Sequence, residues 1–351
     1  MAPPEPFDVV ATYKRLLTED PDLTMPIAAI EALIHGLAST PSITTVSETL
    51  DLVSKLTTHL KSSIPNSISL SAGTDIFQQY LIANLHNPKS SGGDFSQIRA
   101  HLVQNGKLFV ARAKAARETI ASFGRQFIRD GNTILTNGGS RVVGALLTAA
   151  AETSNSSSRG SIRFRVIYIT PLPNSSSPET DPESAANITA LRALGIPVAT
   201  IPPTAIAFCL SQVTQCFVGA EGVVENGGII SRMGTYQMGM LAKAAGIPFY
   251  VVAESHKFVR LYPLGQEDLG IEQEVVDFRT AEGKVRDEKE SVRDEGVADM
   301  EEGEEGKRKE LAWRPEDAVD YTPPNLISGI ITESGVLLPS AVSERLIEIW
   351  F

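Results

Sequence analysis

Two glycine-rich turns are the places in this 351-residue chain where residue types and spacing could do chemistry. The first turn holds Asn137, Gly138, Gly139, Ser140 and Arg141, and the second holds Gly219, Glu221, Asn226, Gly227, Gly228 and Arg232. Each turn follows a short apolar run and precedes a helical pattern, so its backbone N–H groups could bind an anion at the start of a helix. Neither turn has the spacing GxGxxG or GxxxxGK[ST] of dinucleotide and P-loop sites. Because such loops also need glycine for backbone reasons, these residues alone leave a ligand site and plain tight turns equally open.

Other reactive side chains are few. Cys209 and Cys216 are too few for a disulfide framework or a four-cysteine zinc site, and we expect two buried thiols. The five histidines show no HxxxH or HExxH spacing, so we expect no metal and no cofactor. Glu221 and Glu225 could act as a carboxylate pair, but glutamates near a helix start are more often caps or solvated acceptors. His256 could approach a cleft because it follows a predicted strand, or it could be an ordinary surface residue.

The elements that must position these turns fall into two groups. Apolar residues at three- and four-residue steps predict helices at 7–17, 26–37, 47–61, 73–85 and 97–129. Gly106 could break the last of them. Later apolar runs predict strands at 133–136, 164–170, 197–201, 216–219, 248–253 and 327–332. Helical patterns between them lie at 140–151, 183–194, 205–212, 235–245 and 339–349. We therefore predict an α/β protein, with an all-helical domain at 1–130 and a Rossmann-like parallel-sheet domain at 131–351.

The composition excludes several function classes. A net charge of −11 argues against a general nucleic-acid grip, which needs many cations on phosphates. No run of about 18 apolar residues exists to span a membrane, and the start of the chain has no readable secretory signal, so we expect a cytoplasmic protein. Residues 280–310 contain twelve acidic and seven basic residues and no aromatic residue. We predict a disordered or weakly helical acidic insertion at about 280–312.

Three long segments resemble a known family: VGAEGVVENGGIISRMGTYQM, AKAAGIPFYVVAESHKFVRLYPL and YTPPNLISGIITESGVLLPSAVSERLI. They are similar to the alpha, beta and delta regulatory subunits of translation initiation factor 2B, and to the alpha subunits most of all. The resemblance covers nearly the whole chain except the acidic insertion. It implies a non-catalytic, cytoplasmic subunit of the complex that exchanges guanine nucleotide on translation initiation factor 2 in the integrated stress response.

The resemblance also implies the partners. A homodimer formed through the Rossmann-like half would join the beta, gamma, delta and epsilon subunits and sense the phosphorylated alpha subunit of translation initiation factor 2. Exposed side chains could line the dimer interface, although core packing is the commoner fate of each: Met233, Tyr236, Met238, Met240, Trp350 and Phe351. No nucleic-acid or membrane partner is expected.

The wider family contains isomerases of ribose 1,5-bisphosphate and methylthioribose 1-phosphate, which supply the rival hypothesis. The resemblance places their catalytic cysteine and aspartate at Gly138 and Glu221 of this chain. Glycine has no proton to transfer, so we expect no catalysis. A sugar-phosphate pocket could be retained, with a vestigial cleft or a free-standing sugar-phosphate sensor as alternatives. Its predicted residues are Gly139, Ser140, Arg141, Glu221, Asn226, Gly227, Gly228 and Arg232.

The predicted helix at 97–129 is basic in an acidic chain, with seven lysines and arginines against Glu118. A phosphoserine carries a charge of about −1.5 to −2 and favours such clusters. We therefore name Arg112 and Lys114 as hypothetical sensors of the phosphorylated partner. The alternative is a solvated face with local ion pairs.

Overall fold

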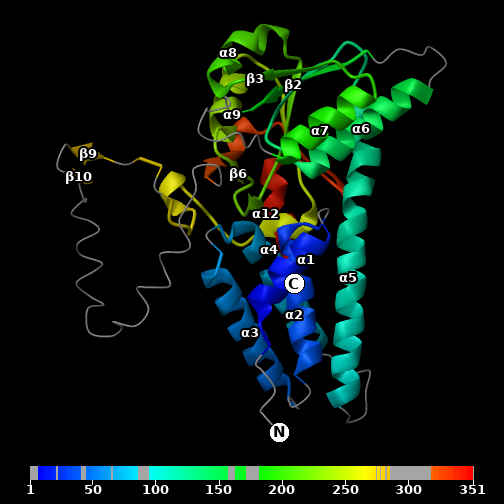
Figure 1. The fold of residues 1–351 in the computed structure, drawn as a ribbon, viewed down its shortest axis with the longest axis vertical. Coiled ribbons are helices and arrows are strands. Elements are labelled where there is room, and N and C mark those ends of the chain that lie inside the picture. The colour runs from blue at the N-terminus through cyan, green and yellow to red at the C-terminus, as the bar shows by residue number, and fades with distance from the viewer. Residues whose placement is uncertain are drawn as a thin grey trace.

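The computed structural model describes residues 7–20, 23–40, 45–64, 66–85, 95–156, 163–170, 182–273, 275–276, 278–280, 283–284 and 318–350. Five helices form the first part: α1 (Val9–Glu19), α2 (Met25–Ser39), α3 (Val46–Ser62), α4 (Ile68–Leu85) and α5 (Phe95–Gly124). Figure 1 shows α5 running from the far end of this helical region up to the α/β region. Its 30 residues form one continuous helix, so the break considered at Gly106 does not occur. A Cβ on Gly106 would lie 2.7 Å from Ile34 Cδ1, so glycine there lets α5 pack closely against α2.

A seven-stranded sheet forms the centre of the second part, in the order β13-β12-β7-β4-β1-β2-β3. Its strands are β1 (Thr133–Asn137), β2 (Arg165–Ile169), β3 (Val198–Ile201), β4 (Gln215–Gly219), β7 (Phe249–Val252), β12 (Gly329–Thr332) and β13 (Gly335–Leu337). All neighbours are parallel except β12 and β13. The predicted Rossmann-like α/β class is therefore confirmed, and the antiparallel edge strand β13 is an addition to it.

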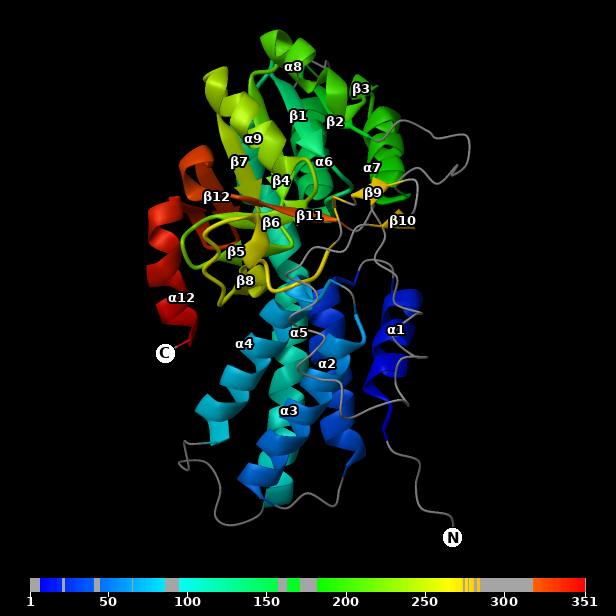
Figure 2. The ribbon, with the colours of Figure 1, turned by 90° about the vertical axis from the view of Figure 1, so that its left-hand side faces the viewer.

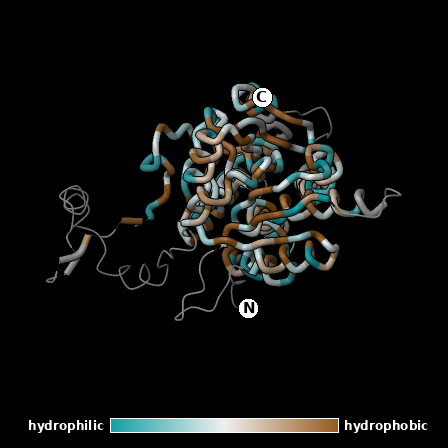
Figure 3. Tube along the Cα trace, turned by 90° about the horizontal axis from the view of Figure 1, so that it is seen from above, coloured by the Kyte–Doolittle hydropathy of each residue, from teal (hydrophilic) through white to brown (hydrophobic). Residues whose placement is uncertain are grey.

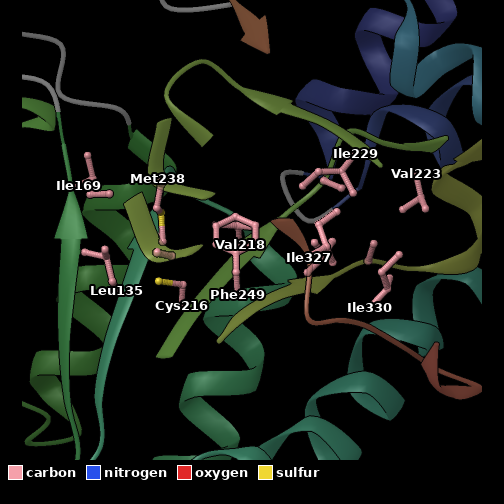
Figure 4. Packing of buried hydrophobic residues seen from close by; sticks show 14 of the residues in the cluster. Leu135, Ile169, Cys216, Val218, Val223, Ile229, Met238, Phe249, Ile327 and Ile330 are labelled. Atoms are coloured by element: carbon pink, nitrogen blue, oxygen red, sulfur yellow. The ribbon is translucent and has the colours of Figure 1, made fainter. Parts of the chain in front are cut away.

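Helices cover both faces of this sheet. One face packs against α5, α6 (Arg141–Ser156) and α7 (Pro182–Ala193). The other packs against α8 (Ile206–Cys209), α9 (Thr235–Ala244) and α12 (Val342–Trp350). Figure 4 shows the second of these cores, which includes Val218 and Phe249 of adjacent strands and Met238 of α9. The predicted helix at 205–212 is instead the four-residue α8 between two short 3-10 turns, which covers little of the sheet.

A second, four-stranded sheet was not predicted. It has the order β11-β6-β5-β8, formed by β5 (Gly222–Val224), β6 (Ile229–Arg232), β8 (Phe258–Val259) and β11 (Val319–Thr322). Figure 2 places it between the large sheet and the helices. Its core includes Ile68 and Ala72 of α4, so it connects the α/β region with the helical region.

Two glutamine side chains cover the outer edge of β11. Gln273 Nε2 donates to Val319 O (2.8 Å), and Val319 N donates to Gln273 Oε1 (3.1 Å). Gln266 makes the same pair of bonds with Tyr321, both at 2.8 Å. Each amide thus replaces the hydrogen bonds of a neighbouring strand.

A short hairpin of β9 (Arg279–Thr280) and β10 (Gly283–Lys284) follows the glutamine segment. The rest of the predicted acidic insertion at 280–312 lies outside the described residues. In the portions of the chain that the structure describes, no helix has both the length and the apolar character needed to cross a bilayer. Figure 3 looks down on the α/β end and shows hydrophobic stretches of chain passing through the body.

Candidate ligand-binding cavity

A cavity of about 540 Å³ lies at the carboxyl ends of β1 and β4, between the helical and α/β regions. These two strands are neighbours at the point where the strand order reverses, which is the usual ligand position in an open α/β sheet. The walls come from the start of α6, the ends of β4 and β6, and the start of α7. The helical region contributes Thr24, Met25 and Pro26 at the start of α2, and Asn66 and Ser69 near the start of α4.

The first glycine-rich turn forms one wall. Gly138 has a φ of +72°, which favours glycine, and the chain then enters the 16-residue helix α6 at Arg141. Gly139 packs so closely that a Cβ there would lie 2.3 Å from Glu183 Cβ of α7. Gly139, Ser140 and Arg141, which the sequence predicted as ligand residues, line the cavity together with Gly138, at a helix N-terminus that favours anions.

Arg141 ties three segments together at this wall. Its Nη1 donates to Leu23 O just before α2 (2.7 Å), and its Nε donates to Glu183 Oε1 on α7 (3.1 Å). Its Nη2 also contacts the same carboxylate oxygen. The positive charge of Arg141 therefore already has a counter-charge within the protein.

Arg232 lies directly over Gly138. It is the last residue of β6, and a Cβ on Gly138 would lie 3.2 Å from Arg232 Cδ and 3.5 Å from Arg232 Nε. A side chain at position 138 would thus compete with the arginine for the same space. The cavity holds a cation in the position where the family resemblance expects a catalytic cysteine.

Glu221 points to the helical region. Asn66 Nδ2 donates to Glu221 Oε2 (2.6 Å), and Ser69 Oγ donates to Glu221 O (2.9 Å). Glu225 lies outside the cavity lining, with its Oε1 3.8 Å from Arg260 Nε. The two glutamates therefore do not form the carboxylate pair that the sequence left open.

Asn226, Gly227 and Gly228 are predicted ligand residues that the structure does not bring to the cavity lining. Asn226 Nδ2 donates to Pro263 O (2.9 Å) and Tyr321 Oη (2.7 Å), while Gly227 turns at a φ of +84° against Pro339. They make the tight turn between the antiparallel strands β5 and β6. An Asn-Gly pair between two short apolar runs is the usual hairpin signal, and it was available in the sequence.

Glu254 and Lys257, which follow the carboxyl end of β7, are among the cavity residues that were not predicted from the sequence. Burial would raise the pKa of Glu254, but the charges of Lys257 and His256 lower it to about 2, and Lys257 Nζ lies 3.2 Å from its Oε2. His256 is buried, its Nε2 3.5 Å from Thr24 Oγ1, and burial lowers its pKa. It is thus neither a cavity residue nor a surface residue. Their place after a strand end was the only signal.

The comparisons with known proteins decide the family. The model of the initiation factor 2 subunit family matches residues 18–339. The chain belongs to the initiation factor 2 subunit family. It is 34% identical to translation initiation factor eIF2B subunit alpha of Dictyostelium discoideum, over 98% of this chain and 97% of that protein. It is 27% identical to the protein of the same name from Caenorhabditis elegans, over 97% and 98% of the two chains.

The family also includes enzymes. The chain is 28% identical to ribose 1,5-bisphosphate isomerase of Thermococcus kodakarensis, over 74% of this chain and 70% of that enzyme. Among solved structures, a chain of the tetrameric eIF2B-beta2-delta2 complex from C. thermophilum has a TM-score of 0.65 and 18% identity. The structural match covers 96% of this chain and 95% of the chain from the complex, so the two chains share one fold.

Two further predicted groups can be placed within this family fold. Cys209 and Cys216 are buried, as predicted, and burial raises the pKa of both, that of Cys216 to about 12. On α5, Arg112 is exposed, whereas Lys114 Nζ lies 3.1 Å from Asp20 Oδ2. Lys114 therefore has the local pairing that the alternative interpretation expected.

The predicted interface residues divide between core and surface. Met238 is fully buried in the core beneath α9. Met233 and Met240 are exposed, and Tyr236 is half-buried. The side chain of Trp350 and all of Phe351 lie outside the described residues. Two of the three methionines are thus accessible to a partner.

Proposed function

We propose that this chain is a regulatory, non-catalytic subunit of an eIF2B-type complex that exchanges guanine nucleotide on translation initiation factor 2. The observation that carries the proposal is its end-to-end match to a protein named eIF2B subunit alpha, at 34% identity. The beta, gamma, delta and epsilon subunits would be its partners.

The cavity supports the absence of catalysis. Isomerisation of a sugar phosphate moves a proton between adjacent carbons and needs a placed acid and base. Gly138 offers no such group, and the Arg232 side chain occupies the space beside it. The Glu221 carboxylate accepts a hydrogen bond from the Asn66 amide of the helical region. The chain therefore lacks a proton-transfer group at position 138.

The cavity also fits a retained sugar-phosphate ligand. The helix N-terminus at Gly139 and Ser140, with Arg232 opposite, suits a phosphate group, and the Glu221 carboxylate could accept from sugar hydroxyls. If the cavity is instead a vestigial cleft, no sugar phosphate should bind. Calorimetry with ribose 5-phosphate and fructose 6-phosphate separates the two, since the proposed site gives heat that Arg232→Ala abolishes. No heat at millimolar ligand refutes the ligand but leaves the regulatory role intact.

The regulatory role is tested by reconstitution. The tagged chain should co-purify with the other four subunits, and the assembled complex should lose exchange activity when the phosphorylated alpha subunit of factor 2 is added. A chain that purifies without partners and leaves exchange unchanged would refute the role.

Sedimentation of the isolated chain tests the homodimer, for which the exposed Met233 and Met240 offer contact surface. A monomer at micromolar concentration counts against the homodimer.

Sensing of the phosphorylated partner is assigned to α5. The double charge reversal Arg112→Glu/Lys114→Glu should weaken inhibition, because it removes two cations that could meet a phosphate. The control Arg15→Glu/Lys55→Glu changes the same charge on exposed residues of α1 and α3. Equal inhibition in both variants would remove α5 from the sensing surface.

The isomerase remains the second candidate, favoured by the match to the Thermococcus kodakarensis enzyme and by a carboxylate in the cavity at Glu221. A turnover assay with ribose 1,5-bisphosphate decides between the two. Steady turnover that Glu221→Gln abolishes would establish the enzyme and refute the non-catalytic role.

A further inference from the structure

The α/β region has a second hollow, at the opposite end of the large sheet from the cavity. A groove of about 320 Å³ lies at the amino ends of β1, β2 and β3, and Arg165, Ile167, Val198, Ala199 and Gln212 are among its lining residues. Figure 2 shows β2 and β3 near the end of the molecule farthest from the helical region. We name this hollow the distal groove.

The short crossover between β3 and β4 explains why the distal groove is open. The other crossovers that cover these strands are helices of 16 and 12 residues, whereas α8 has four residues and rises only about 6 Å. It packs Ile206 and Cys209 on the sheet but leaves Arg165 and Ala199 exposed. An uncovered part of a sheet face beside an edge strand is a place where another chain can lie.

The rim of the distal groove is basic. Exposed arginines lie on the elements around the amino ends of these strands: Arg125, Arg129, Arg163, Arg165 and Arg192. Acidic residues on these elements are Asp130, Glu152 and Glu183, of which Glu183 pairs with Arg141 at the cavity end of α7. This is a local excess of positive charge in a chain whose net charge is −11.

One of these arginines, Arg165, lines the groove, and Arg192 lies beside it on α7. Arg165 Nε donates to Thr133 Oγ1 (2.8 Å), and Arg192 Nη2 donates to Val198 O (3.0 Å) on the edge strand β3. Both guanidinium groups keep further N–H donors beyond these bonds, and arginine binds carboxylates through paired donors. Ile167 and Ala199 line the groove together with Arg165 and give it an apolar floor.

We propose that the distal groove binds an acidic, extended segment of a partner protein, with carboxylates on Arg165 and Arg192 and small apolar side chains over Ala199. Charge complementarity selects this occupant, since a basic rim attracts acidic peptides and repels basic ones. A second copy of this chain is disfavoured, because a twofold contact would bring the same arginines together. The edge strand and apolar floor favour a peptide over RNA, which binds through stacked bases and phosphates.

The test uses the full-length chain and a fluorescent 12-residue peptide of alternating glutamate and valine, measured by anisotropy. The wild-type chain should bind it, and Arg165→Glu/Arg192→Glu should weaken binding by about tenfold or more. Ala199→Glu should do the same without touching either internal hydrogen bond. The matched control Arg15→Glu/Lys55→Glu should bind as the wild type does, and a lysine-valine peptide should not bind.

Four results would overturn the proposal. Equal weakening in the control variant would mean that only net charge matters. Tighter binding of a single-stranded RNA of similar length would make the groove a nucleic-acid site. A change in the sedimentation of Arg165→Glu/Arg192→Glu relative to the wild type would make it a contact between copies. Absence of binding at 100 μM peptide would also refute it.

Discussion

Replacing Gly138 by alanine should measure how strongly a side chain at position 138 is crowded by Arg232 in the cavity. Gly138 has a φ of +72°, where an alanine is destabilised by about 1–2 kcal/mol. The new Cβ would also lie 3.2 Å from Arg232 Cδ, so the arginine must move by a few tenths of an ångström. We expect about 0.5–1 kcal/mol of further loss from this contact.

Gly131 supplies the matched control. Its φ is +85°, and no atom lies within 4 Å of the position that a Cβ would take. Gly131→Ala should therefore show the backbone strain alone. Chemical unfolding followed by circular dichroism gives the free energy of unfolding for each variant.

A double-mutant cycle isolates the contact. In an Arg232→Ala background, Gly138→Ala should lose only as much stability as Gly131→Ala, because the crowded side chain is gone. In the wild-type background, Gly138→Ala should also weaken any sugar-phosphate binding, since Arg232 has shifted. Additive losses, with Gly138→Ala equal to Gly131→Ala, would refute the view that the two positions share one space.

Three further predictions concern other parts of the α/β region. Burial raises the pKa of Asp320 to about 7, so the folded state holds its proton more tightly than the unfolded chain does. The free energy of unfolding should therefore fall by about 1.4 kcal/mol per pH unit as the pH rises from 4 to 7. Urea unfolding should show that Asp320→Asn removes this pH dependence. Asn226→Ala should lower stability but leave calorimetric ligand affinity unchanged, because Asn226 bonds Pro263 and Tyr321 outside the cavity; a loss of affinity alone would contradict this. Gln273→Ala should destabilise the fold by about 1–3 kcal/mol in thermal or chemical unfolding, since both backbone groups of Val319 lose their partner; no change would show that water replaces it.

The central strands of the large sheet could be predicted from sequence because they are buried on both faces. The predicted strands at 164–170 and 248–253 lie within a residue of β2 (Arg165–Ile169) and β7 (Phe249–Val252) at each end. The predicted helix at 183–194 matches α7 (Pro182–Ala193) equally well. Continuous apolar runs of this length alternate with helical periods, and that contrast is a local signal.

The small sheet was missed because its strands carry no such contrast. β5, β6 and β8 have three, four and two residues and lie among glycines that also suit a ligand turn. The sequence therefore assigned Asn226, Gly227 and Gly228 to the ligand when the hairpin uses them. Backbone turns and phosphate loops need the same residue types, so composition alone could not separate them.

Part of the candidate site could be predicted, and the rest depends on the tertiary fold. Gly139, Ser140 and Arg141 follow a strand directly, so a local pattern finds them. The contact between Asn66 and Glu221 joins residues 155 positions apart, and the bond from Arg141 to Leu23 O joins residues 118 positions apart. The sequence pattern of neither segment indicates which distant residue its side chain will contact.

The two glutamine amides on β11 have a consequence for how this chain can change. Gln266 and Gln273 precede β11 in the sequence, and their amides hydrogen-bond the backbone of Tyr321 and Val319. These bonds help to fix the register of β11, whatever the length of chain between residues 273 and 318. The entropic cost of closing a loop grows only slowly with the length of the loop. The stretch after Gln273 can therefore gain or lose many residues in evolution while the hydrogen-bonding frame of the small sheet stays as it is.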